Sequence, residues 1–174
     1  MKQDLELPIG EKIIVLGCPG SGKSTFARKL QEKTKLPLIH LDNIWWRPDR
    51  THITREEFDL RLDELLRGEA WIMDGYYSRT VEVRIRACDT VVLLDFSEEV
   101  CMQGITERLG TVRPDMPWTE AALDPELVEL VRKYQTENRP TLLALLEQYP
   151  EKRLLRFSTR AEADAWLAAL PDAM

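Results

Sequence analysis

A glycine-rich stretch near the N-terminus carries the residues whose chemistry is clearest. Residues 17–24 follow the spacing G-x-x-x-x-G-K-[ST], the pattern of a phosphate-binding loop. They are Gly17, Cys18, Pro19, Gly20, Ser21, Gly22, Lys23 and Ser24, and Thr25 follows them. In this pattern backbone N–H groups surround a phosphate chain, the lysine reaches the β- and γ-phosphates, and the serine hydroxyl ligates Mg²⁺. The stretch therefore predicts a site for ATP and Mg²⁺, with Ser24 as a metal ligand.

The segments on either side of this loop have the patterns that such a loop requires. Residues 13–16 form a short apolar run rich in β-branched side chains, which is typical of a buried parallel strand. Residues 26–33 place apolar and charged side chains at helical spacing and predict an amphipathic helix. A strand, a glycine loop and a helix in this order favour a phosphate-binding loop over a chance glycine-rich turn.

Two aspartates end predicted strands and could act in the same site. Asp74 ends the apolar run 70–73, where a carboxylate can hold Mg²⁺ through water, although an ordinary turn aspartate is the alternative. Asp42 ends the run 38–41 and could accept the proton of an attacking hydroxyl group. It could equally cap the segment that follows it. Both carboxylates are therefore candidates, Asp74 for the metal and Asp42 for proton transfer.

Several arginines lie beside glycine or proline breaks in the second half of the chain. Charge builds up on a phosphoryl group during its transfer, and arginine offers a planar fork to its oxygens. Arg108, Arg113 and Arg139 are candidates for this role, with a solvated surface position as the alternative for each. For Arg160, which follows the last predicted strand, a solvated position in the first turn of a helix is favoured over stacking on a base.

Length and composition limit the class of protein. The 174 residues suffice for one domain with a sizeable core, and 44% of them are hydrophobic and 31% charged. A net charge of −6 argues against general nucleic-acid binding. No apolar run has the length of a membrane span, and Cys18, Cys88 and Cys101 show neither a disulfide framework nor zinc spacing. We expect a cytoplasmic protein without a membrane or direct nucleic-acid partner.

Predicted strands and helices alternate along the chain. The strands are expected at about 12–16, 38–42, 70–74, 90–96 and 153–157. Helix starts are indicated by capping residues at Thr54, Ser97, Asp124 and Thr159, and Arg139-Pro140 is expected to interrupt the helix that follows Asp124. Such alternation predicts a single α/β domain, residues 1–174, with a parallel sheet between helices and a ligand site at the carboxyl ends of the strands.

Taken together, these segments resemble the adenylate-kinase-like P-loop kinases, and within them the branch described as DNA-topology-modulation-like proteins. The resemblance covers the chain after residue 11 and is carried by the loop 17–25, His40-Leu41-Asp42, Trp45-Trp46-Arg47-Pro48, the stretch 74–80, the segment 108–113, Pro114-Asp115-Met116 and Arg139-Pro140. It implies a three-layer fold with a five-stranded parallel sheet in the order 2-3-1-4-5. It also implies an acceptor-binding segment at about 42–68, a mobile lid at about 108–118, and an acceptor phosphate held by Arg79.

We therefore expect a kinase that transfers the γ-phosphoryl group of MgATP to a small acceptor of the nucleotide type. The catalytic candidates are Lys23, Asp42, Arg79, Arg108 and Arg113, and the metal candidates are Ser24 and Asp74. One alternative is a kinase of a hydroxylated metabolite or nucleoside that uses Asp42 as a base. Another is a regulatory nucleotide-binding protein linked to DNA topology, which the net charge disfavours as a direct DNA binder. The sequence names neither the acceptor nor the oligomeric state.

Overall fold

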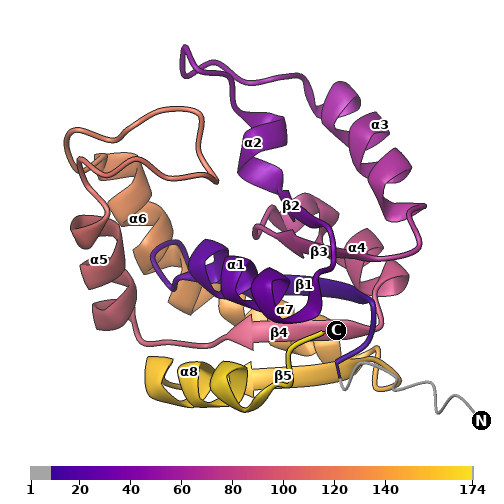
Figure 1. Ribbon diagram of the computed structural model, residues 1–174. Helices are drawn as coiled ribbons and strands as arrows, with labels where there is room; N and C mark the ends of the chain where they lie inside the picture. Colours follow the sequence, from indigo (N-terminus) through magenta and orange to yellow (C-terminus); the bar gives the residue numbers. More distant parts are fainter. Residues whose placement is uncertain (1–8, 174) are drawn as a thin grey trace, which may run out of the picture.

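Five parallel strands run through the centre of the molecule (Figure 1). The computed structural model describes residues 9–173. Across the sheet the strands follow the order β2-β3-β1-β4-β5, as the family resemblance implied. Their bounds are Lys12–Gly17 for β1, Leu38–His40 for β2, Trp71–Asp74 for β3, Thr90–Leu94 for β4 and Arg153–Phe157 for β5.

Helices connect the strands and cover the sheet (Figure 1). Their bounds are Lys23–Thr34 for α1, Leu41–Trp45 for α2, Arg55–Leu66 for α3, Val81–Ala87 for α4, Glu98–Glu107 for α5, Pro125–Lys133 for α6, Arg139–Glu147 for α7 and Arg160–Ala169 for α8. The predicted capping residues are confirmed. In each case the side chain accepts a hydrogen bond from a backbone N–H of the first helical turn, and the four residues are Thr54, Ser97, Asp124 and Thr159. No helix within residues 9–173 is both long and apolar enough to cross a membrane.

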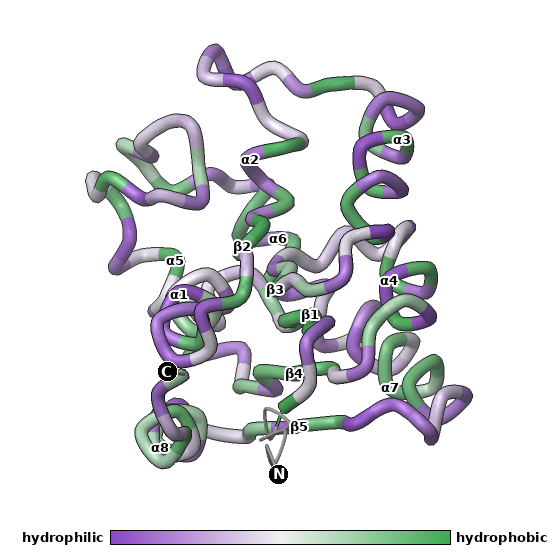
Figure 2. Tube along the Cα trace, turned by 45° about the vertical axis from the view of Figure 1, so that its right-hand side comes forward, coloured by the Kyte–Doolittle hydropathy of each residue, from purple (hydrophilic) through white to green (hydrophobic). Residues whose placement is uncertain are grey.

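Side chains of the central strand alternate between two hydrophobic layers, one on each face of the sheet. Ile13 and Val15 pack in the layer that includes buried residues of α1, α5, α6 and α8. Ile14 and Leu16 pack in the opposite layer, with buried residues of α3, α4 and α7. Because successive strand residues point to opposite faces, an unbroken apolar run is what a strand buried on both faces requires. In Figure 2 the tube is green, the colour of hydrophobic residues, along β4, which is buried on both faces. Along α3, which is buried on one side only, green alternates with the purple of hydrophilic residues.

Two predicted boundaries were wrong. Strand β2 ends at His40, and residues 41–45 form the short helix α2, so Asp42 lies in a first helical turn instead of at a strand end. The helix after Asp124 is also not broken at Arg139-Pro140: a π-helical turn, Tyr134–Asn138, links α6 to α7. Proline is tolerated because it occupies the first turn of α7.

The phosphate-binding loop packs closely against α5 through two glycines. Gly20 has φ +84°, and a Cβ added to it would lie 2.1 Å from the carbonyl oxygen of Cys101. A Cβ added to Gly104 would lie 1.9 Å from the carbonyl oxygen of Gly20. Both contacts are with backbone atoms, which cannot rotate away as a side chain can. Gly104, which sequence reasoning did not single out, therefore fixes how near α5 comes to the loop.

We expect Gly104→Ala to destabilise the protein, because the new methyl group must displace either α5 or the loop. The free energy of unfolding should fall by about 1–3 kcal/mol, as for other overpacked cores, and nucleotide affinity should fall with it. Urea denaturation of the two proteins measures the first effect. Gly68→Ala is the milder control, because its added Cβ would lie 3.2 Å from the carbonyl oxygen of Leu65, and a shift of a few tenths of an ångström relieves that contact. Equal losses of stability in the two variants would contradict this account.

Candidate functional site

The phosphate-binding loop lies at the carboxyl end of β1, in the middle of the sheet, and leads directly into α1. The backbone N–H of Ser21 donates to the carbonyl oxygen of Cys18 at 3.0 Å, which closes the loop. Gly22, with φ +92°, precedes the first residue of α1. The first N–H groups of a helix have no partner within the helix, so the loop and the start of α1 present donors to an anion. The sequence prediction of strand, loop and helix is confirmed here.

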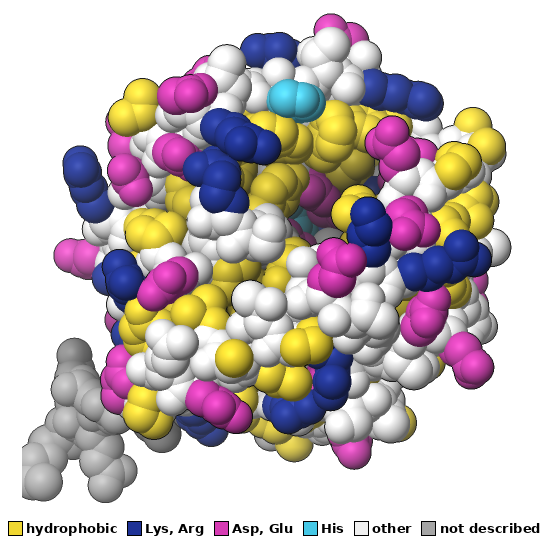
Figure 3. Space-filling model, turned by 180° about the vertical axis from the view of Figure 1, so that it is seen from behind, with side chains coloured by type: hydrophobic (Ala, Val, Ile, Leu, Met, Phe, Trp, Pro, Cys, Tyr) yellow, Lys and Arg dark blue, Asp and Glu magenta, His cyan; other side chains and the backbone are white. Residues whose placement is uncertain are grey.

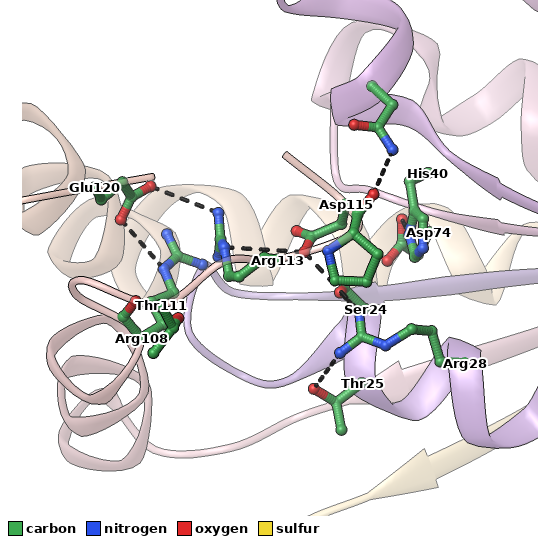
Figure 4. A network of polar contacts seen from close by, with 12 residues as sticks. Ser24, Thr25, Arg28, His40, Asp74, Arg108, Thr111, Arg113, Asp115 and Glu120 are labelled. Atoms are coloured by element: carbon green, nitrogen blue, oxygen red, sulfur yellow. Dashed lines mark hydrogen bonds and ion pairs between the residues drawn. The ribbon is translucent and has the colours of Figure 1, made fainter. Parts of the chain in front are cut away.

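Beside this loop lies a cleft of about 390 Å³ (Figure 4). Its walls come from the loop, α2, the end of β3 and the long connection after α5. The predicted site residues that line it are Gly20, Gly22, Lys23, Ser24, Thr25, Asp42, Asp74, Arg108 and Arg113. Seen from behind the view of Figure 1, the molecule has a hollow with acidic side chains inside it and hydrophobic side chains along much of its rim (Figure 3). The structure thus brings most of the predicted residues to one cleft.

Lys23 is partly buried in this cleft, with carboxylates close to it. Its Nζ donates to the carbonyl oxygen of Cys18 at 3.0 Å. Removal from water lowers the pKa of Lys23, and the negative charges of Asp42 and Asp74 act in the opposite direction. The ammonium group is therefore held at the loop by a backbone carbonyl, and the acids across the cleft favour its charged form. A phosphate oxygen is a stronger partner than the carbonyl that Lys23 now contacts.

Asp74 is buried at the end of β3, as predicted, and has a partner that sequence reasoning did not assign. His40, the last residue of β2, lies in register with Asp74 across the sheet, and its Nδ1 is 3.0 Å from Asp74 Oδ1. Both side chains are at least nine-tenths buried. A carboxylate held by a ring nitrogen on one oxygen has a fixed direction and keeps its second oxygen for another partner.

Asp42 lines the same cleft and accepts a hydrogen bond from a tyrosine. The hydroxyl of Tyr77 donates to Asp42 Oδ1 at 2.5 Å. Burial raises the pKa of Asp42, the hydrogen bond from Tyr77 lowers it, and the charge of Asp74 raises it further. An aspartate with a raised pKa is a better proton acceptor than an exposed one, provided that it is still ionised at working pH.

The loop that carries Tyr77 is held rigid by Arg84 of α4. Arg84 is fully buried, and its guanidinium donates to the carbonyl oxygens of Gly75, Tyr76 and Tyr77 and to the hydroxyl of Thr80. Burial lowers its pKa to about 10, so it stays charged at neutral pH. Tyr77 has φ +39°, an unfavourable conformation for a bulky side chain that its surroundings must impose. Sequence reasoning missed Arg84, because its partners are backbone carbonyls that leave no mark in a sequence pattern.

The predicted lid residues Arg108 and Arg113 lie together on the connection after α5, and an acid stands between them (Figure 4). Nε of Arg108 is 3.5 Å from one carboxylate oxygen of Glu120, and Nη2 of Arg113 is 3.6 Å from the other. Burial lowers the pKa of Arg108, and the charge of Arg113 lowers it further. These contacts exceed hydrogen-bond length, and within the described residues Arg108 Nε has no hydrogen-bond partner. Both guanidinium groups therefore have donor capacity left for an anion in the cleft.

Arg79 does not reach the cleft, in contrast to the expectation that it would hold an acceptor phosphate there. It lies in a short 3₁₀ turn, Ser78–Thr80, and forms two hydrogen bonds of 2.9 and 2.8 Å with the carboxylate of Asp59 on α3. The pair is close to half exposed. Because both guanidinium Nη atoms are engaged by one carboxylate, Arg79 ties α3 to the turn before α4 and does not line the cleft.

Two further arginines differ from their predicted surroundings. Arg139 makes hydrogen bonds of 2.7 and 3.0 Å with Asp95, the residue after β4, and does not line the cleft. Arg160 donates to the carbonyl oxygens of Gly20 and Ser21, and its guanidinium lies 5.6 Å from the ring centroid of Phe96. Arg160 therefore supports the phosphate-binding loop instead of being merely solvated.

Comparison with known proteins places this site in a family. A family model described as an AAA domain matches residues 13–113, which is more than half of the chain. The chain belongs to this AAA domain family. The matched range runs from β1 to Arg113 and contains the phosphate-binding loop, Asp42 and Asp74.

Similar proteins point to the same fold. Two adenylate kinases from Thermotoga neapolitana are each 28% identical over 129 residues, and the match covers 55% of this chain and 57% of each relative. A shikimate kinase structure from Bacteroides thetaiotaomicron has a TM-score of 0.56 at 19% identity and covers 90% of this chain and 93% of its own. A sugar kinase structure from Janibacter sp. has a TM-score of 0.54 at 18% identity, with 90% and 89% covered. The likeness establishes a P-loop kinase fold and confirms the predicted fold class.

We expect Asp42→Asn to raise the melting temperature at neutral pH. The pKa of Asp42 is raised in the folded state, so the ionised carboxylate lowers stability at any pH above that pKa. As the pH falls through the raised pKa of Asp42, the carboxyl group takes up a proton and this loss of stability disappears. The melting temperatures of the two proteins, measured from pH 8 down to pH 4, should therefore converge at the acid end. A variant less stable than the wild type at pH 8 would contradict this.

Proposed function

We propose that this protein is an ATP-dependent kinase of a small molecule, which transfers the γ-phosphoryl group of MgATP to an acceptor bound in the cleft. The strongest support is that one cleft is lined by all the side chains expected for this reaction: Lys23, Ser24, Asp74, Arg108 and Arg113. A phosphate-binding lysine, two oxygen ligands for a metal and two lid cations are the groups that phosphoryl transfer requires.

The residues present fit Mg²⁺. Ser24 and Asp74 both line the cleft and both offer oxygen, the ligand atom that Mg²⁺ prefers. His40 already directs Asp74, which is how a ligand carboxylate is usually oriented. When bound, the ion would neutralise charge on the β- and γ-phosphates. Ser24 would hold it directly and Asp74 through water.

The roles proposed for the chain's own residues follow from where each one lies. The N–H groups of the loop and Lys23 would bind the phosphates of ATP. Arg108 and Arg113 would turn from Glu120 toward the transferring phosphoryl group, where negative charge accumulates. The connection that carries them would then exclude water from the cleft, so that the acceptor and not water receives the phosphoryl group.

For the acceptor, we propose a molecule that presents a hydroxyl group. Asp42 lines the cleft and is held by Tyr77 in a fixed orientation, as a general base must be. Among the described cleft residues, the cations are Lys23, Arg28, Arg108, Arg113 and Arg160, which belong to the loop, α1, the lid and α8. The acceptor side contributes Asp42 and Asp74. An uncharged hydroxyl compound suits such a surface better than a phosphate dianion does.

A nucleotide acceptor is the second candidate. It is favoured by the similarity to adenylate kinases and by the sequence stretch from Asp74 to Arg79. The ion pair between Arg79 and Asp59 stands against it, because Arg79 would have to leave a two-bond partner to reach the cleft. The more specific likeness to the DNA-topology-modulation-like branch rests on sequence motifs alone.

We expect Lys23→Ala to abolish phosphoryl transfer while the fold is retained. The assay is ADP release from MgATP in a screen of nucleosides, sugars, other hydroxylated metabolites and nucleoside monophosphates. A compound counts as an acceptor when it raises the rate of ADP release above the rate measured with MgATP alone. Circular dichroism checks the fold of the variant. Undiminished turnover in a folded Lys23→Ala protein would refute the kinase assignment.

Asp42→Asn and Arg79→Ala should separate the two acceptor classes once the screen has found an acceptor. For a hydroxyl acceptor, loss of the base in Asp42→Asn should lower kcat by roughly 10²–10⁴-fold with MgATP affinity kept. Arg79→Ala should then be close to wild type. The reverse order, with a large loss in Arg79→Ala and a mild one in Asp42→Asn, would establish the nucleotide candidate instead. Near-normal kinetics in both variants would place the acceptor outside this cleft.

A further inference from the structure

Arg28 of α1 contacts the residue that is proposed to bind the metal (Figure 4). Its Nη1 donates to Ser24 Oγ at 2.7 Å, and its Nη2 donates to Thr25 Oγ1 at 3.3 Å. About one third of the Arg28 side chain is exposed, and it lines the cleft. The sequence pattern assigns no role to this position, which looks like one more charge on the outer face of an amphipathic helix. Its contacts instead join it to the metal ligand.

Asp115 lies across the cleft, in the lid, and lacks a full set of partners. Its side chain is 8% exposed, and within the described residues its buried Oδ1 accepts no hydrogen bond. Arg28 Nη1 lies 3.9 Å from this oxygen and Arg113 Nε lies 3.8 Å from it. A hydrogen bond between a guanidinium and a carboxylate is about 2.7–2.9 Å long. Each arginine is therefore about one ångström too far away, and a small movement would complete the bond.

A metal ion at Ser24 conflicts with the present position of Arg28. The Ser24 oxygen that would ligate Mg²⁺ now accepts an N–H of a guanidinium that carries a full positive charge. Two cations that share one oxygen repel each other, and the divalent ion dominates the local field. This repulsion favours release of Ser24 by Arg28 when the metal binds. Asp115 stands close by, with an oxygen that has no hydrogen bond.

We propose that Arg28 is a positioning residue that exchanges partners between the metal site and the lid. Without nucleotide it holds the Ser24 hydroxyl; when Mg²⁺ takes that hydroxyl, Arg28 moves to Asp115 and draws the lid onto the loop. The residue before Asp115 is Pro114, whose carbonyl oxygen accepts a hydrogen bond of 2.7 Å from the side chain of Asn43 in α2. A movement of Asp115 is therefore passed on to α2, the helix that carries Asp42. This rests on the proposed MgATP site, and it assigns to Arg28 and Asp115 the coupling of metal binding to lid closure.

The first test measures binding of a non-hydrolysable ATP analogue by calorimetry, once with Mg²⁺ and once with EDTA. In Asp115→Asn, affinity with Mg²⁺ should fall about tenfold, the effect of one charge-assisted hydrogen bond, while affinity in EDTA should stay near the wild-type value. In an Arg28→Ala background, Asp115→Asn should have no further Mg²⁺-dependent effect, because Arg113 remains beside Asp115 with and without the metal and the arginine that comes from the metal site is already gone. The Mg²⁺-dependent non-additivity is the result expected from partner exchange.

A second readout follows the lid itself. Addition of the Mg²⁺ complex should slow amide hydrogen exchange over residues 108–120 in the wild type and do so much less in Asp115→Asn. Asp172→Asn is the matched control, because it removes a carboxylate that pairs with Lys33 of the same helix α1 but is far more exposed. The control should behave as the wild type in both experiments.

Several outcomes would overturn the proposal, and they differ from those that refute the kinase assignment. Equal losses of affinity with Mg²⁺ and with EDTA in Asp115→Asn would show a structural role only. Additive effects of Arg28→Ala and Asp115→Asn would show that the two residues act independently. Binding of the analogue by the wild type that does not depend on Mg²⁺ would remove the metal from the proposed function, and partner exchange with it.

Discussion

The register of three neighbouring strands determines where the polar residues of the cleft lie. Asp74 is paired with Val15 of β1 on one side and with His40 of β2 on the other. Because side chains alternate along a strand, a shift of one residue in β3 would turn Asp74 to the opposite face and break its contact with His40. The register is fixed by the apolar residues before Asp74, which fill both hydrophobic layers. The packing of the sheet thus sets the direction of the carboxylate at its edge.

The cleft holds charges of both signs, and most of them are matched within the protein. Lys23 contacts a loop carbonyl, Arg28 the Ser24 hydroxyl, and Arg108 and Arg113 the carboxylate of Glu120. Each of these contacts is weaker than the one that a phosphate would provide, either because the acceptor is neutral or because the distance exceeds 3.4 Å. In the proposed kinase, these partners would hold the cations beside the cleft until a phosphate replaces them.

The sequence predicted what depends on local patterns. The glycine spacing of the loop, the buried strands and the capping residues are all short-range signals, and the structure has them where the pattern indicated, apart from the end of β2, where α2 begins after His40. Residues whose role depends on distant partners were missed or misjudged. Arg79 seemed free to hold a phosphate, but Asp59, twenty positions earlier, binds it. Gly104 matters only because the backbone of Gly20 lies against it, and no helical pattern reveals that contact.

For Asp42, the sequence predicted the position of the residue but not the contacts that fix its side chain. Its closeness to the loop was foreseen, because the carboxyl ends of parallel strands meet at one edge. Its position in a helix and its hydrogen bond from Tyr77 were not foreseen. The hydrogen bond depends on the strained backbone of Tyr77, which the buried Arg84 holds in place. Strain of this kind persists only where the surrounding contacts enforce it. Arg84 supplies that enforcement through hydrogen bonds to three consecutive carbonyl oxygens. Because the buried Arg84 holds the turn that places the Tyr77 hydroxyl against Asp42, the acceptor side of the proposed kinase has a fixed carboxylate, and the movement that the proposal needs falls to the proposed lid.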